Sequence, residues 1–221
     1  MKPAFTLLQR RVLGVLIEKS LSTPTTYPLT LNTVAIGCNQ FSCRDPVMKL
    51  TEDEVAKGLR ELQEAGYVTE WNPTRNARVE RFSHNMEEQV GWNQYKQAII
   101  AELMLRGPQT PGQLKTNASR LAPLLDLDAV GLILDALSTE EPPIVRRLPR
   151  QPGKNASRYS HLLSSEPEPS VAEAEVSSTT LQVPHPPELE VRVATLEREV
   201  AALRQELQNL KRESGVGGEH D

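Results

Sequence analysis

Residues 81–84 read Arg-Phe-Ser-His, and residues 158–161 read Arg-Tyr-Ser-His. A second match precedes each of them, because Asn-Ala stands at 76–77 and again at 155–156. Two short matches in the same order and at nearly the same spacing indicate an internal repeat, in which one supersecondary unit occurs twice. The chain has 221 residues, which is enough for two such units.

Helical patterns lie upstream of both matches. Apolar residues that step by four and three lie on one face of a helix. These steps occur once in each copy, at Val55, Leu59 and Leu62 and at Val130, Leu134 and Leu137. An earlier amphipathic helix is predicted in each copy, from Leu8, Val12, Val15 and Leu16 in the first and from Ile99, Ile100 and Leu103 in the second.

The residues that begin and end helices agree with this pattern. Thr51 and Glu54 form a capping box before one predicted helix, and Gly66 stands where that helix should end. Thr110 and Pro111 are typical of an N-cap and a first helical residue. Two hairpins follow, with predicted strands at 67–71 and 78–83 and at 144–148 and 157–161.

Three helices followed by a two-stranded hairpin is the order of the winged helix, a helix-turn-helix variant. The sequence therefore predicts a mainly α protein with small β-hairpins (α+β) and two tandem winged-helix domains. The alternative is a helical bundle whose halves match by chance. The predicted parts are winged-helix domain 1 at 1–88, winged-helix domain 2 at 89–163, a disordered acidic Pro/Ser/Glu tether at 164–187, a coiled-coil helix at 188–213 and a disordered tail at 214–221.

A heptad pattern near the C-terminus predicts dimerisation. Its apolar positions alternate steps of four and three, at Leu189, Val193, Leu196, Val200, Leu203, Leu207 and Leu210. In a parallel pair the flanking residues would meet as opposite charges, at Arg192–Glu197, Glu199–Arg204 and Glu206–Lys211. We expect a homodimer through this coiled coil, and the alternative is a single solvated helix.

Composition limits the class of protein. The net charge is −4, but residues 1–161 carry 20 basic and 17 acidic residues (+3), whereas residues 162–221 carry 5 and 12 (−7). The sequence has no apolar run of about 20 residues for a membrane span and no secretory signal pattern, so we expect a cytoplasmic protein without membrane contact. Metal and cofactors are not expected, because the two cysteines have no partner pattern and no phosphate loop occurs.

Enzyme activity is not expected either, because no nucleophile stands in a recognisable catalytic context. His84 and His161 occupy matched positions of the repeat. Duplication at matched sites favours a packing or hydrogen-bonding role for them over catalysis.

The second hairpin gives the strongest functional signal. Between Pro142 and Ser165 there are five basic residues and no acidic one, and guanidinium groups suit phosphate contact. The candidate nucleic-acid-binding residues are Arg146, Arg147, Arg150, Lys154 and Arg158, together with Arg75, Arg78 and Arg81 of the first hairpin. The alternative is a solvated hairpin whose charges protect an edge strand. The predicted third helices, at 52–65 and 126–137, are acidic, which opposes insertion into a DNA groove.

A polar block lies between the second and third predicted helices of the first copy. Between its first and third helices, the first copy is about ten residues longer than the second copy. Its candidate interaction or structural residues are Asn39, Gln40, Arg44 and Asp45. They could form exposed polar contacts, or Asn39 could cap a helix while Arg44 and Asp45 pair internally to hold the connection. The structural interpretation is favoured.

Several ordered blocks resemble one protein family. They read LGVLIEKS, TTYPLTLNTVAIGCNQ, RDPVM, LMLRGPQTPGQL and LPRQPGKNASRYSHL, and together they are similar to the YceH-like family of uncharacterised bacterial proteins over about 5–163. The resemblance implies a tandem winged-helix fold and brings no established activity. The chain departs from the CNQKSNRDPVM-type block of that family, with Phe41 at a Lys-like position and Cys43 at an Asn-like position.

Two functions remain open from sequence. The first is a dimeric nucleic-acid-binding regulator that contacts phosphates through the second hairpin, with DNA as its ligand. The second is an adaptor or assembly factor whose winged helices dock a protein partner, as some tandem winged-helix proteins do. The basic hairpin favours the first and the acidic third helices favour the second.

Overall fold

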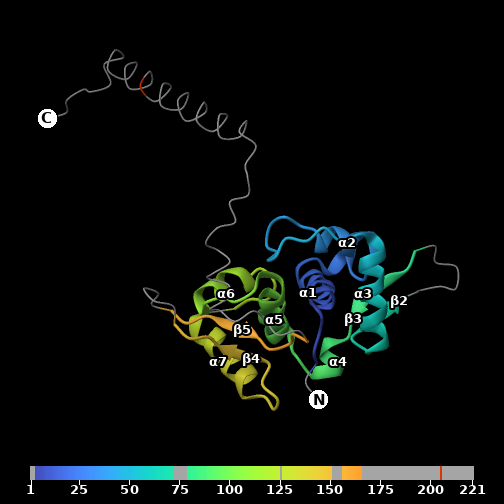
Figure 1. Ribbon diagram of the computed structural model, residues 1–221. Coiled ribbons are helices and arrows are strands. Elements are labelled where there is room, and N and C mark those ends of the chain that lie inside the picture. Colours follow the sequence, from blue (N-terminus) through green and yellow to red (C-terminus); the bar gives the residue numbers. More distant parts are fainter. Residues whose placement is uncertain (1–2, 72–78, 125, 151–155, 166–204, 206–221) are drawn as a thin grey trace. The chain divides into compact units, whose positions relative to one another are not determined.

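The computed structural model describes residues 3–71, 79–124, 126–150, 156–165 and 205 (Figure 1). The chain divides by its internal contacts into Met1–Glu168 and Pro169–Asp221, and every element below belongs to the first unit. The predicted coiled coil and tail lie outside the described residues, apart from residue 205. The described part is mixed α+β, with seven α-helices and small antiparallel sheets, which confirms the predicted class at this level.

The first copy runs from a long central helix to a three-stranded sheet. Its elements are α1 (Leu7–Ser22), a short 3-10 turn (Pro24–Thr26), β1 (Leu29–Thr30), α2 (Leu31–Cys38), α3 (Glu52–Glu64), β2 (Val68–Trp71) and β3 (Arg81–His84). The predicted capping box at Thr51 and Glu54 begins α3, and Gly66, at φ 81°, follows its end. The strand order is β1-β3-β2, antiparallel throughout.

The second copy repeats this order after a short linker helix, α4 (Met86–Val90). Its elements are α5 (Gln94–Arg106), α6 (Pro111–Ala118), α7 (Leu127–Thr139), β4 (Val145–Arg147) and β5 (Tyr159–His161). Thr110 caps α6 with a capping box to Gln113, and Pro111 is the first helical residue, as predicted.

The sequence pattern missed one strand position in each copy. β1 pairs with β3, so Leu29 faces Phe82, and the bridge between Gln109 and Tyr159 repeats this pairing in the second copy. In both copies the paired residue directly precedes a threonine that caps the next helix, Thr30 or Thr110. A strand of one or two residues leaves no alternation to detect.

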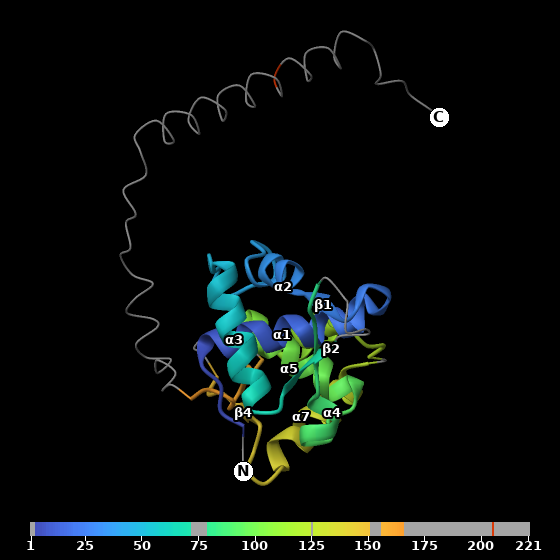
Figure 2. The ribbon, with the colours of Figure 1, turned by 90° about the vertical axis from the view of Figure 1, so that its right-hand side faces the viewer.

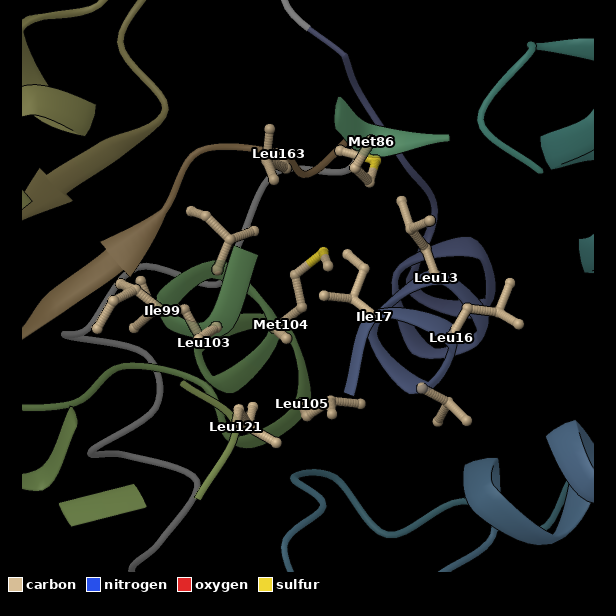
Figure 3. Packing of buried hydrophobic residues seen from close by; sticks show 14 of the residues in the cluster. Leu13, Leu16, Ile17, Met86, Ile99, Leu103, Met104, Leu105, Leu121 and Leu163 are labelled. Carbon is tan, nitrogen blue, oxygen red and sulfur yellow. The ribbon is translucent and has the colours of Figure 1, made fainter. Parts of the chain in front are cut away.

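The core is shared by both copies, and α1 and α5 lie at its centre in both views (Figures 1 and 2). Each helix is buried on all sides over its middle turns, from Arg11 to Glu18 in α1 and from Gln97 to Leu105 in α5. Figure 3 shows Ile17 of α1 facing Met104 of α5. A Cβ at Gly14 would lie 3.0 Å from Leu105 side-chain atoms, so the two helices approach closely there.

Backbone hydrogen bonds also join the start of the first copy to the end of the second. The N–H of Phe5 donates to the Leu163 carbonyl at 2.8 Å, and the N–H of Ser165 donates to the Phe5 carbonyl at 3.0 Å. Phe5 and Leu163 are both buried. The two copies are therefore tied through their ends as well as through their central helices.

Candidate functional site

The second hairpin presents arginines to solvent. In the register of β4 and β5, Arg146 faces Ser160 and Arg147 faces Tyr159, and the N–H of Leu148 donates to the Arg158 carbonyl at 2.7 Å. Arg146, Arg147 and Arg150 are exposed, whereas Arg158 is half-buried. Lys154 lies outside the described residues. Val145 and Leu148 are buried beneath the exposed arginines, so the hairpin is fixed to the core at its base.

Among its described residues, the first hairpin presents fewer candidate arginines to solvent than the second. Arg81, in β3, is half-buried, and its guanidinium Nη1 donates to the Pro28 carbonyl at 2.8 Å, beside β1. That bond holds the hairpin to the segment before α2. Arg75 and Arg78, the other two predicted residues of this hairpin, lie outside the described residues.

The outer faces of the third helices are acidic. Glu52, Asp53 and Glu54 are exposed in the first turn of α3, where the helix dipole stabilises negatively charged side chains. Hydrogen bonds from the Thr51 backbone and hydroxyl hold the pKa of Glu54 below its usual value. In α7, Asp128 and Asp135 are exposed.

The polar block after α2 faces inward. The amide of Asn39 donates to the Leu50 carbonyl and accepts from the Leu50 N–H, both at 2.7 Å, which closes the connection into a loop. Arg44 is buried, and its guanidinium donates to the Gly37 carbonyl at 3.0 Å and to Gln40 at 2.7 Å. The charged partner of Arg44 is Glu18 of α1, where the sequence had suggested the neighbouring Asp45.

This inward anchoring leaves apolar side chains on the outside of the same segment. The Asp45 N–H donates to the Leu105 carbonyl at 2.8 Å, and Arg11 donates to the Pro46 carbonyl, so both halves of the loop are tied to the central helices. Phe41 is nevertheless 88% exposed. Ile36, in α2, and Val47 are exposed as well.

Two buried carboxylates at the centre of the molecule were missed from the sequence. Glu18 of α1 and Glu102 of α5 have side chains that are 2% and 0% exposed. One guanidinium nitrogen of Arg120, in the segment after α6, contacts both carboxylates, at 2.7 and 2.8 Å. Arg44 pairs with Glu18 and Arg106 pairs with Glu102, so each acid has a further basic partner.

The electrostatics of this network favour the charged form of Glu18. Burial disfavours a charged Glu18, but the hydrogen bonds and charges of Arg44 and Arg120 outweigh burial and hold the pKa of Glu18 below its usual value. Arg120 remains 41% exposed at the side chain and joins residues from both copies. The network thus ties α1 to α5. Sequence alone gave no signal for it, because its members lie up to 102 positions apart.

The matched histidines make matched hydrogen bonds. Nδ1 of His84 accepts from the Met86 N–H, and Nδ1 of His161 accepts from the Leu163 N–H, in each case two residues further along. Nε2 of His84 lies 2.8 Å from the Ser20 hydroxyl. Burial lowers the pKa of His84 to about 4, so its imidazole is neutral at pH 7.

The described residues contain no gathering of three His, Cys, Asp or Glu side chains that could hold a metal ion. Within the same residues, no helix is both long and apolar enough to cross a membrane. Burial raises the pKa of the Cys38 thiol to about 12, so this side chain is protonated and unreactive at pH 7.

Comparison with known proteins places the chain in a family. Residues 5–154 match the family model described as "Protein of unknown function, DUF480". A UPF0502 protein of Geobacter sulfurreducens is 47% identical over 87% of each chain. UPF0502 proteins of Acidovorax sp. and Dechloromonas aromatica are 43% and 40% identical, over 94% and 96% of this chain and 93% and 98% of their own. The chain belongs to the DUF480 (UPF0502) family. The resemblance to a family of uncharacterised bacterial proteins is thereby confirmed.

The two departures from the expected family block now have structural meaning in this DUF480 member. Phe41, at the Lys-like position, points an apolar ring to solvent where a lysine would carry charge. Cys43, at the Asn-like position, has φ 63°, a left-handed conformation that asparagine tolerates better than most side chains. Both positions lie in the connection between α2 and α3, which is longer than the matching connection of the second copy.

Proposed function

We propose that this protein is a non-enzymatic tandem winged-helix protein that contacts nucleic-acid phosphates through the hairpin of its second copy. The observation that carries the proposal is the exposure of Arg146, Arg147 and Arg150 on a hairpin that contains no acidic residue among its described positions. Arginine binds phosphate through paired N–H donors, and such contacts need no particular base sequence.

The arrangement of elements supports the winged-helix assignment. Each copy has a helix, a short strand position, two further helices and a hairpin whose second strand pairs with the short strand position. In DNA-binding proteins of this class the third helix enters the major groove. The acidic outer faces of α3 and α7 oppose that contact, so the proposed binding uses the hairpin and reads little sequence.

Two chains would strengthen this weak contact. The heptad positions from Leu189 to Leu210 favour a parallel dimer, which would bring two basic hairpins onto one nucleic acid. Linked sites bind with an increased effective concentration, so a dimer can bind where one hairpin alone would dissociate.

The test is the salt dependence of binding of the full-length protein to a random-sequence DNA duplex, measured by fluorescence anisotropy. We expect a log–log slope of about −3 to −5, because each phosphate contact contributes about −0.9. Changing Arg146, Arg147 and Arg150 to Ala should make the slope less negative, by about the amount that three phosphate contacts contribute. The matched control changes three exposed basic residues elsewhere, Lys49, Lys57 and Arg60, and should retain most of the slope. Absence of binding at low salt removes this function.

A second function, protein docking, is favoured by a separate observation. Phe41 is 88% exposed on a loop that Asn39 and Arg44 anchor from beneath. A large aromatic side chain on a fixed backbone is typical of residues that dominate protein interfaces, since little order is lost on binding. If the DNA experiment fails, a photoreactive side chain at position 41 should cross-link a partner in cells, while one at exposed Trp71 should not.

A further inference from the structure

α7 carries apolar side chains on its solvent side as well as on its core side. Val130, Leu134 and Leu137 form the core side and are fully buried. The second stripe, with spacing i, i+3, i+4 and i+7, consists of Ala129, Leu132, Ile133 and Ala136. Leu132 and Ala136 are exposed, whereas Ala129 and Ile133 are half-buried, and Ile133 also packs against the edge of the core. Leu132 is 72% exposed, near the middle of the helix.

The polar residues of this helix all have one sign. Between Leu127 and Leu137 the only polar side chains are Asp128 and Asp135, and both are exposed. They border the second stripe one turn before and one turn after Leu132. A surface helix normally has a polar outer face, and an apolar outer stripe is typical of a helix that packs against a further partner.

We infer that the outer face of α7 docks a basic amphipathic helix of a partner protein. The stripe extends over two turns, about 10 Å, and its spacing is the one at which a second helix packs along the first. The small side chains of Ala129 and Ala136 flank Leu132 and let a partner backbone approach. Asp128 and Asp135 supply the charge that selects lysine or arginine beside the partner's apolar stripe.

The same charges disfavour other occupants. A second copy of α7 would bring aspartates against aspartates, and nucleic acid would bring phosphates against them. The heptad segment of this chain at 188–213 carries six acidic and five basic residues, so it lacks the matching excess of positive charge. The inference does not rest on the proposed nucleic-acid function, because it uses side chains of α7 and none of the arginines of the second hairpin.

The experiment measures binding of two designed helical peptides to the full-length protein by fluorescence anisotropy. Both peptides have leucines at i, i+3, i+4 and i+7; the remaining positions are lysine in one and glutamate in the other. We expect the lysine peptide to bind and the glutamate peptide not to bind. Leu132→Lys should weaken binding roughly tenfold or more, since loss of a central apolar contact commonly has this effect. The double variant Asp128→Asn, Asp135→Asn should weaken binding and flatten its salt dependence.

Controls separate docking at α7 from attraction to an acidic chain. Asp53→Asn with Glu64→Gln removes two exposed charges from α3 instead, and Leu127→Lys changes an exposed leucine outside the stripe. Neither should alter binding by more than about twofold, the usual size of an effect away from an interface centre. Circular dichroism melting checks that each variant folds. We expect all of them to fold, because the changed residues are exposed.

Four results would overturn the inference. The first is no binding of the lysine peptide, and the second is equal loss of binding in the α3 control. The third is binding that appears only when Leu196 and Leu203 are changed to Ala, because the chain's own segment would then cover α7. The fourth is self-association that Leu132→Lys abolishes, which would make a second copy the occupant.

Discussion

The two copies of the repeat agree where they face each other and differ where they face solvent. Both copies cap their second helix with a threonine, Thr30 or Thr110, and both end their hairpin on a histidine whose Nδ1 accepts a backbone N–H. Both also bury a glutamate of the first helix and pair it with an arginine that follows the second helix. The matched parts are therefore those on which the shared core depends.

Three differences between the copies lie on the surface. The first copy has the long anchored loop with Phe41 outside, whereas the second copy has a short connection there. The second copy has the exposed arginines of its hairpin and the apolar outer stripe of α7. Since the core needs none of these features, they are the places where a duplicated unit could acquire different ligands. The predictions below test the shared core first and the differences last.

The largest effect is expected from breaking the buried network that joins the copies. Glu18→Ala leaves the guanidinium of Arg44 buried without its acid, and removal of one member of a buried ion pair lowers stability by about 3 to 5 kcal/mol. Urea denaturation followed by circular dichroism measures this change. The control is Lys57→Ala, which removes a partly exposed i,i+4 pair with Glu61 and should lower stability by less than about 1 kcal/mol. Equal effects of the two substitutions would show that the network does not hold the copies together.

The second prediction concerns pH and the histidine of the first copy. The folded-state pKa of His84, about 4, lies below its ordinary value of 6.5, so the unfolded chain takes up this proton first. Stability is therefore complete above about pH 6.5 and falls as pH decreases toward 4, by up to about 3 kcal/mol from this group. Glu18, whose folded pKa is also lowered, adds a loss only at lower pH, below its usual value near 4.5.

Urea midpoints at several pH values measure this dependence. His84→Asn keeps an acceptor for the Met86 N–H and removes the titrating ring, so its stability should change less between pH 7 and pH 5. An unchanged slope in the variant would assign the pH dependence to other groups.

The third prediction tests the contact between α1 and α5. Gly14→Val places a side chain against Leu105, where even a Cβ would lie at 3.0 Å, so we expect a loss of about 1 to 3 kcal/mol from overpacking. Gly131→Ala in α7 is the matched substitution, because its Cβ meets nothing within 4 Å. It should stabilise the helix by roughly 0.5 to 1 kcal/mol. Thermal melting of both variants gives opposite signs if α1 and α5 pack as described.

Sequence reasoning recovered the features that have a local pattern. Thr51 with Glu54, Thr110 with Pro111 and Gly66 all begin or end helices as predicted, because caps and stops depend on neighbouring residues. The strands are shorter than predicted, since β4 ends at Arg147 and β5 begins at Tyr159. Hairpin pairing depends on the partner strand, which a single strand's pattern does not reveal.

The features that sequence missed depend on contacts between distant residues. Glu18 and Glu102 look like ordinary surface acids within their helices, and only the packing of α1 on α5 buries them beside Arg120. Exposure is equally hidden, because Leu132 belongs to a run of apolar residues in which the buried ones cannot be told from the others. Arg44 is a further example, because its charged partner is Glu18, 26 positions away in the sequence, and not the neighbouring residue.

The smallest effects should come from the loop that distinguishes the first copy. Cys43→Asn places at φ 63° a residue that tolerates this conformation, so we expect a gain of about 0.5 to 1 kcal/mol in unfolding free energy. Phe41→Lys should leave stability within about 0.5 kcal/mol, because surface changes away from contacts have little effect. It should also steepen the salt dependence of DNA binding by about one phosphate contact if this loop lies near the nucleic acid. An unchanged slope would place the loop away from the nucleic acid and leave Phe41 free to contact a protein, so the two copies would then serve different partners.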